Sequence, residues 1–425
     1  MFKVLVIAYY YPPMGLSGVQ RTLKFTKYMS EYGWEPTVLT STKTGYFAHD
    51  YTLLEEVEAS KINVVRVGAN DLNSVLKKFG TIKIPSEWIR RIYNRIIQSV
   101  FIPDNKKSWA KKAAEKAREI LSNENFDAIF VTIPPFSSFV EFAKIKKEFN
   151  LPLIVDYRDL WYDSYFSFYL TLFHKMAHKK LEYNSLKNAN RIIVTNRNIK
   201  ESLLKNFPFL SFEDVTIIRH GYDAHDFDEI NIAPRENKKI IITHSGNFIE
   251  YTTPQYLFEA YKLLKKENPE IAAKFELHFV GLLGRNFIGL IKKLKLVSNV
   301  KLHGYVNHKE SVKKLLESDV LWMMIDNRKN IEAILPGKTL EYAGARKLIF
   351  ANIPNGAAKI VLEEYKSAII TPPRDIKKIK EGFIQIYEMF SQGEVPAHDE
   401  DFVLNHERKC LTQHLTKEFQ FLLKT

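Results

Sequence analysis

The chain has 425 residues, of which 45% are hydrophobic and 13% aromatic, and it carries a net charge of +13 and a single cysteine, Cys410. This length exceeds what one hydrophobic core usually spans, so two domains are expected, and the composition excludes an intrinsically disordered chain. One cysteine excludes an internal disulfide framework and fits a reducing compartment.

Short apolar runs alternate with stretches of helical period, the pattern of parallel sheets flanked by helices. In the first half, the expected strands are Val4–Ala8, Pro36–Leu39, Val64–Val67, Ala128–Thr132, Leu153–Tyr157, Arg191–Thr195 and Val215–Ile218. Helices expected between them include Val19–Tyr32, Lys107–Asn123 and Phe136–Phe149. We therefore expect a first doubly wound domain over residues 1–225.

The second half repeats this alternation. Its expected strands are Lys239–Ser245, Phe275–Val280, Val300–His303, Val320–Ile325 and Leu348–Ala351, and its expected helices include Pro254–Glu267, Ile376–Phe390 and Asn405–Leu423. A polar stretch containing Pro234 separates the halves and predicts a hinge at 226–238. A second domain over 239–400 and a C-terminal helix over 401–425, packing back on the first domain, complete the expected α/β fold, in which two Rossmann-like domains face one another across a cleft.

The first strand leads through the loop YYYPPMGLSGVQR into a helix. Gly15 and Gly18 allow the backbone to approach a ligand closely, and a helix start offers N–H groups to a phosphate. The loop lacks both the GxGxxG and the GxxxxGK[ST] spacing, which disfavours a nicotinamide or flavin enzyme. Taken alone, it could equally be a plain strand-to-helix turn.

Together with later segments, this loop resembles the retaining glycosyltransferases of family four, which have the two-domain GT-B fold. The resemblance covers nearly the whole chain. Its segments are FIPDNKKSW (101–109), TIPPFSS (132–138), IVDYRDLW (154–161), RIIVTN (191–196), IIRHGYDAHDF (217–227), ITHSGNF (242–248), FVG (279–281), LHGYV (302–306) and PGKTLEYAGARKLIF (336–350). It implies a nucleotide-diphosphate sugar donor, with Gly15, Gly18 and Arg21 facing that donor.

The segment PGKTLEY, with Gly337, Lys338, Thr339 and Glu341, is the strongest donor signal. A helix start supplies amides to a diphosphate, and Lys338 adds a positive charge beside them. In the family, the glutamate of this helix binds the ribose, and that position is Glu341. A capped helix with a solvated Lys–Glu pair is the alternative interpretation.

Two departures from the family pattern concern the donor sugar. The first glutamate of the EX7E pair would fall at Ala333, one residue from Glu332. The stretch after Gly246 also lacks the Arg and Lys that many members use for the diphosphate, so Lys338 or Arg285 is expected to supply that charge. Gly304 matches the position where relatives contact the base through the backbone.

The charged run Asp156-Tyr157-Arg158-Asp159 ends a strand and predicts a reaction centre. Asp156 or Asp159 could act as a general base toward the acceptor, or Arg158 and Asp159 could form a structural ion pair. Many relatives have a histidine near Arg158, which this run lacks. In the family, transfer is described as front-face attack in which the departing diphosphate accepts the acceptor's proton.

The first domain is the expected acceptor domain, and Trp109, Pro135, Phe136 and Trp161 are the candidate acceptor contacts. Residues 84–101 combine apolar and aromatic side chains at helical spacing with arginines, which suits an anionic lipid interface or a lipid-diphosphate acceptor. The same segment could instead pack its apolar face on the first sheet. The aromatic stretch Tyr162–Phe173 could line the acceptor groove.

The sequence therefore predicts a transferase that assembles a surface polysaccharide or glycolipid. No apolar run reaches the ~18 residues of a membrane-spanning helix, and the opening Met1–Ala8 is too short for a signal peptide, so a cytoplasmic location, peripheral at the membrane, is expected. No cofactor, metal or nucleic acid is expected, because no ligand spacing or reading module is present. A sugar-nucleotide epimerase and a non-catalytic, nucleotide-sugar-binding subunit are the alternatives.

Overall fold

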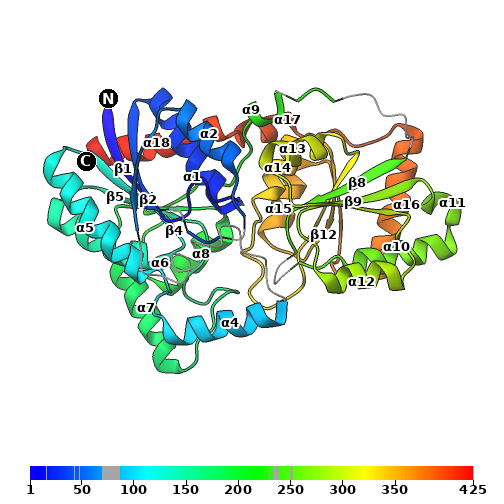
Figure 1. Ribbon diagram of the computed structural model, residues 1–425, viewed down its shortest axis with the longest axis horizontal. Coiled ribbons are helices and arrows are strands. Elements are labelled where there is room, and N and C mark those ends of the chain that lie inside the picture. The colour runs from blue at the N-terminus through cyan, green and yellow to red at the C-terminus, as the bar shows by residue number, and fades with distance from the viewer. Residues whose placement is uncertain are drawn as a thin grey trace. The chain divides into compact units, whose positions relative to one another are not determined.

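The computed structural model describes residues 1–424 except 16, 43, 47, 69–86, 229, 233–238 and 249–251. The chain divides into two compact units (Figure 1). Unit 1 comprises Met1–His220 together with Arg408–Thr425, and unit 2 comprises Gly221–Glu407. The break at 220/221 lies a few residues before the expected hinge, whose residues 229 and 233–238 are outside the described part of the chain.

Unit 1 is built on a seven-stranded parallel sheet with the order β3-β2-β1-β4-β5-β6-β7. Its strands are β1 (Phe2–Ala8), β2 (Trp34–Ser41), β3 (Asn63–Val67), β4 (Ala128–Ile133), β5 (Leu153–Tyr157), β6 (Arg191–Val194) and β7 (Val215–Ile217). The strand order reverses between β1 and β4, and ligands of such sheets bind outside the carboxyl ends at this switch point.

The helices of unit 1 are α1 (Ser17–Tyr28), α2 (Tyr51–Ala59), α4 (Glu87–Val100), α5 (Lys107–Asn123), α6 (Phe136–Phe149), α7 (Leu172–Leu186), α8 (Arg197–Asn206) and α18 (Arg408–Lys424). The helix expected to reach Tyr32 ends at Tyr28 and continues as a 3₁₀ turn to Tyr32, which Gly33 closes with a φ of 81°. The last helix, α18, belongs to unit 1 because the buried Phe419 contacts Trp34 and Phe130, with ring centroids 5.0 and 5.5 Å away.

Unit 2 has a six-stranded parallel sheet with the order β10-β9-β8-β11-β12-β13, which reverses between β8 and β11. Its strands are β8 (Ile240–Ser245), β9 (Phe275–Val280), β10 (Val300–Gly304), β11 (Val320–Met324), β12 (Leu348–Asn352) and β13 (Ala368–Thr371). An aromatic core that includes Phe258, Phe275, Phe279, Trp322 and Phe383 covers one face of the sheet.

The helices of unit 2 are α9 (His225–Asp228), α10 (Gln255–Glu267), α11 (Pro269–Ala272), α12 (Arg285–Lys293), α13 (His308–Leu316), α14 (Lys338–Gly344), α15 (Ala357–Tyr365), α16 (Ile376–Gln392) and α17 (Glu400–Asn405). The helix expected over Asn405–Leu423 corresponds to α18, which begins at Arg408. The residues before it form a separate short helix, α17, whose amino end is capped by Asp399. Within the described residues, no helix combines the length and apolar composition that crossing a bilayer requires.

Candidate functional site

Three glycines lie at the carboxyl ends of the neighbouring strands β8, β9 and β10 of unit 2, the first two directly after their strand and the third as its last residue. Gly246, Gly281 and Gly304 have φ angles of 123°, 119° and 71°, a region that side chains with a Cβ rarely adopt. The Gly246 N–H donates to Val280 O at 2.8 Å, and a Cβ on Gly281 would lie 2.6 Å from Gly246 O. The carboxyl edge of this sheet is therefore bare backbone, which a ligand can approach closely.

Lys338 reaches this edge from the start of α14. A Cβ built on Gly246 would lie 2.6 Å from Lys338 Nζ, so the ammonium rests on the glycine backbone. Burial lowers the pKa of Lys338 to about 8, against a smaller raising effect from Glu341. A half-buried ammonium beside glycine backbone is a suitable partner for a phosphate group.

His244, two residues before Gly246, positions that ammonium. Its Nδ1 lies 3.0 Å from Trp322 O, so Nδ1 carries the proton and donates it, which leaves the Nε2 lone pair to accept from Lys338 Nζ at 3.2 Å. Burial and the Lys338 charge hold the pKa of His244 well below its usual value. The neutral ring also stacks on Phe248 at 4.4 Å. Sequence reasoning did not single out His244, whose only signal is a histidine inside a buried strand.

Tyr342 holds α14 against the end of β8. Its hydroxyl accepts from Ser245 N at 2.8 Å and donates to Ser245 O at 3.3 Å. Thr339 is fully buried and its hydroxyl contacts Met323 Sδ, so its side chain anchors the helix from inside. Gly337 precedes the helix with an ordinary φ of −56°. These contacts fix the position of α14 and therefore the positions of the Lys338 and Glu341 side chains.

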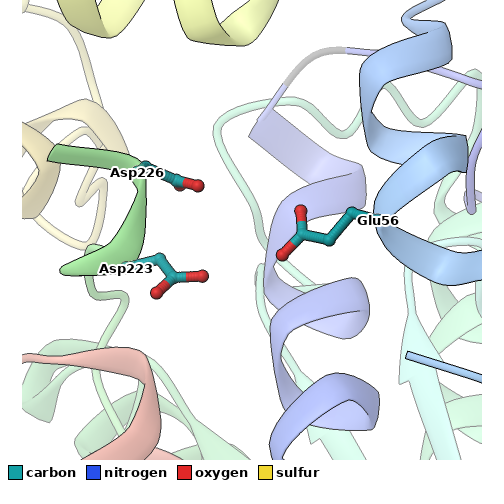
Figure 2. A group of neighbouring side chains, drawn as sticks. All are labelled: Glu56, Asp223 and Asp226. Carbon is teal, nitrogen blue, oxygen red and sulfur yellow. The ribbon is translucent and has the colours of Figure 1, made fainter. Parts of the chain in front are cut away.

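Glu341 lies one turn into α14 and keeps a partly exposed carboxylate. His308 Nδ1 lies 3.7 Å from Glu341 Oε1, and His308 Nε2 lies 2.9 Å from Asp226 Oδ2. Asp226 stands on α9, close after Asp223 (Figure 2). The imidazole is therefore held by Asp226 and lies near the Glu341 carboxylate, at a distance longer than a hydrogen bond. Arg285 begins α12 on the exposed surface, a few residues after β9.

In unit 1, Arg21 and Asp156 form a fully buried ion pair. Arg21 Nη2 lies 2.8 Å from Asp156 Oδ1, and both side chains have 0% exposure. Arg21 also donates to the carbonyls of Ile218 and Arg219 at 2.9 and 2.7 Å. The pair therefore joins α1, β5 and the chain after β7. Arg21, which was predicted to face the donor, is instead buried inside unit 1.

Figure 2 shows a further carboxylate of this unit, Glu56 on α2, which accepts a hydrogen bond from Lys24 at 2.8 Å.

Arg158 ties together the loops after β1 and β4. It donates to Ile133 O at 3.2 Å, to Pro134 O at 3.1 Å and to Gly18 O. Gly18 is exposed at the start of α1, and the buried Gly15 donates its N–H to Ala48 O at 2.9 Å. The guanidinium is thus engaged by backbone carbonyls and does not form the ion pair with Asp159 that the sequence left open.

Asp159 is the half-buried carboxylate of this region. Burial raises its pKa, against the lowering effect of Arg158. His220, at the end of unit 1, has its pKa held well below the usual value by burial and by the charges of Arg21, Arg408 and Arg158. A neutral imidazole therefore lies within the field of the same arginines.

The predicted acceptor residues divide into core and edge positions. Trp109 is fully buried and packs on Tyr9 at 5.1 Å, and Pro135 is buried before α6. Phe136 is half-buried and stacks on Trp161 at 4.9 Å, while Trp161 Nε1 donates to His178 Nδ1 at 2.9 Å. Phe136 is therefore the one of the four with a ring edge open to a ligand, and Trp161 supports it.

Comparison with known proteins divides the chain into two parts, each matched by its own family model. Residues 18–226 match the family model described as Glycosyltransferase Family 4, and residues 226–393 match that of Glycosyl transferases group 1. No curated protein matches the chain.

Solved structures show the same two-domain GT-B fold. A glycosyltransferase from Rickettsia africae has 16% identity and a TM-score of 0.68, and the match covers 100% of this chain and 99% of that one. Anabaena HepE, solved in complex with UDP-glucose, has 13% identity and a TM-score of 0.65, with 99% and 100% covered. The UDP-GlcNAc 2-epimerase of Neisseria meningitidis has 12% identity and a TM-score of 0.57, with 100% of both chains covered.

Proposed function

We propose that this chain, which belongs to glycosyltransferase family four and is a transferase of the GT-B fold, moves a sugar with retention from a nucleotide-diphosphate sugar to a glycan or lipid-linked acceptor. The product would be a surface polysaccharide or glycolipid, made at the cytoplasmic face of a membrane. One observation carries the proposal: Lys338 Nζ rests on the bare backbone of Gly246, held there by His244.

The donor diphosphate would lie against this ammonium. One N–H of Lys338 is directed to His244, which leaves the other two to donate to phosphate oxygens. The backbone at Gly246 and Gly281 has no side chains to exclude the phosphates. This arrangement supplies the positive charge that the missing Arg and Lys would provide and requires no metal ion.

Glu341 would hold the ribose. A carboxylate can accept from two neighbouring hydroxyls, and the His308 ring, held by Asp226, lies 3.7 Å from this carboxylate. The backbone at the end of β10, at Gly304, would contact the base. Arg285, exposed on α12, is a second candidate cation for the donor.

Catalysis in this proposal is mainly positioning and charge stabilisation. As the glycosidic bond to the diphosphate breaks, negative charge grows on the leaving oxygen, and a preorganised Lys338 stabilises that charge. The acceptor hydroxyl attacks the same face, and its proton passes to the departing phosphate oxygen. Asp159 is the candidate for a protein base toward the acceptor hydroxyl, because Asp156 is already in an ion pair with Arg21.

Transfer kinetics of Lys338→Gln and Glu341→Gln test the assignment. Both variants are expected to raise the donor Kd by roughly tenfold or more, since each loses a hydrogen bond to a charged group worth about 1.5–3 kcal/mol. Lys293→Gln and Glu388→Gln are the controls, because both side chains are exposed in unit 2. Unchanged donor use in both test variants, with folding intact, would contradict the proposal.

The likeness to an epimerase structure gives the second candidate function. A transferase releases nucleoside diphosphate in proportion to added acceptor, whereas an epimerase interconverts two nucleotide sugars without one. Measuring both products with and without acceptor separates the two activities. Epimer formation by the purified protein in the absence of acceptor would show that the protein is an epimerase.

A further inference from the structure

The helix α7 of unit 1 buries polar side chains and exposes apolar ones. His174, His178 and Glu182, four residues apart, point inward and are 5%, 7% and 0% exposed. Tyr157 donates to Glu182, and Trp161 donates to His178 at 2.9 Å. On the outside, Leu172, Phe173 and Met176 are 81%, 79% and 70% exposed. A helix of a water-exposed surface has the opposite arrangement.

The neighbouring helix α4 exposes a second apolar stripe. Ile92, Ile96 and Val100 recur every four residues and are all more than half exposed. Gln98 on the inner side receives a hydrogen bond from Phe168 N at 2.6 Å and donates to Phe166 O at 3.0 Å. These bonds join α4 to the segment that leads into α7, and both helices lie along the same edge of unit 1 in Figure 1. The side chains at 87–91 are outside the described part of the chain.

The charges around these apolar side chains are mainly positive, and the exposed Asp163, which precedes the second stretch, pairs with Lys175 at 3.2 Å. Residues 88–103 and 164–181 contain no aspartate or glutamate. Arg95, Lys179 and Lys180 are exposed there, and Lys175 is half-buried beside the Tyr162 and Tyr169 rings. Aliphatic and aromatic side chains mixed with lysine and arginine match the boundary between acyl chains and anionic headgroups.

We infer that α4 and the amino-terminal half of α7 form one lipid-docking face that inserts Leu172, Phe173 and Met176 into an anionic phospholipid surface. The inference deepens the membrane location of the proposed function by naming the surface and its partner. Charge favours lipid over a second copy of the chain, because two copies would bring the same basic side chains together, and the nearby Asp163 is already paired with Lys175 of its own chain. It also changes the role of Tyr162–Phe173, whose carboxyl end faces lipid rather than lining an acceptor groove.

Vesicle flotation tests the face directly. The wild-type protein is expected to bind vesicles of phosphatidylcholine with phosphatidylglycerol and to bind phosphatidylcholine alone much more weakly. The double substitution Leu172→Ser, Phe173→Ser removes two inserted side chains, so the partition coefficient should fall by roughly 100-fold. Lys179→Gln, Lys180→Gln should reduce binding to the anionic vesicles by roughly tenfold or more while leaving the weak binding to neutral vesicles unchanged. Phe212→Ser is the matched control, since Phe212 is 70% exposed elsewhere in unit 1.

Thermal melting of each variant shows whether it is folded, and donor hydrolysis in detergent-free buffer reports the donor site separately. Retained vesicle binding by the folded Leu172/Phe173 variant overturns the inference. A lipid-independent dimer in light scattering that this variant loses overturns it as well and assigns the face to a second copy. Loss of vesicle binding with unchanged donor hydrolysis supports the lipid face whatever the fate of the proposed transfer reaction.

Discussion

Replacing Gly246 by alanine perturbs the contact on which donor binding is proposed to rest. The new Cβ would lie 2.6 Å from Lys338 Nζ and 3.3 Å from its Cε, so the ammonium must move by roughly 1 Å to restore ordinary contact distances of ~3.5 Å. A φ of 123° also strains any residue with a Cβ, by about 1–3 kcal/mol. We expect lower stability and, because Lys338 is displaced from its charge-assisted contact of about 1.5–3 kcal/mol, a donor Kd raised by roughly 10- to 100-fold.

Isothermal titration with the donor measures the Kd, and urea unfolding measures the stability. Gly393→Ala is the matched control, because Gly393 has a φ of 73° and no atom within 4 Å of the position that a Cβ would take, so it tests strain without displacement. In a Lys338→Ala background, Gly246→Ala should change the donor Kd little. Wild-type donor binding by Gly246→Ala, or an equal weakening in both backgrounds, would refute this role for the glycine–lysine contact.

Three further predictions concern titration and burial. Because burial lowers the pKa of Lys338 to about 8, the donor Kd measured by titration calorimetry should rise about tenfold between pH 7 and pH 9. The donor Kd of Lys338→Arg, which stays charged, should not change over that range. A parallel rise of the Kd in both proteins would show that Lys338 is not the titrating group. Burial raises the pKa of Glu182 to about 8, so the folded state holds a proton that the unfolded state loses near pH 4.5. The free energy of unfolding should therefore fall by up to about 1.4 kcal/mol per pH unit from pH 4.5 to 8. Urea titrations of Glu182→Gln should show a smaller slope. Asp156→Asn leaves Arg21 buried without its counter-charge and should cost about 3–5 kcal/mol of stability; activity lost at unchanged stability would instead indicate a catalytic role for Asp156.

The strands were largely predictable because each is a short, buried apolar run. Leu153–Tyr157 and Phe275–Val280 were predicted with the bounds they have in the structure. The strand Ala368–Thr371 was not predicted, because four residues with alternating burial give too weak a signal beside the following prolines. The short helix α17 was not predicted, because its six residues directly follow a polar stretch and are too few to show a helical period.

The candidate site was predictable where chemistry and local sequence coincide, as at Lys338 and Glu341 in one short helix. It was not predictable where partners come from distant segments. His244 contacts Lys338 across 94 residues, and Arg21 meets Asp156 across 135. Residue type alone also predicts the wrong buried face for α7, because the apolar Leu172 and Phe173, which a sequence pattern would place inside, are exposed.

Donor binding by unit 2 is most directly tested by thermal shift with a panel of UDP-, GDP-, ADP- and CMP-sugars. Ligand at 100 times its Kd stabilises a folded protein by about 2.7 kcal/mol. We predict that at least one nucleoside-diphosphate sugar raises the Tm of the wild-type protein and that the CMP-sugar, which has a single phosphate, has little effect. For Lys338→Ala and Glu341→Ala, a Kd raised roughly tenfold or more should reduce the stabilisation at the same donor concentration to about 1.4 kcal/mol or less, so the Tm shift should be about half as large or smaller. No shift with any donor, or equal shifts in the wild type and both variants, would contradict this prediction.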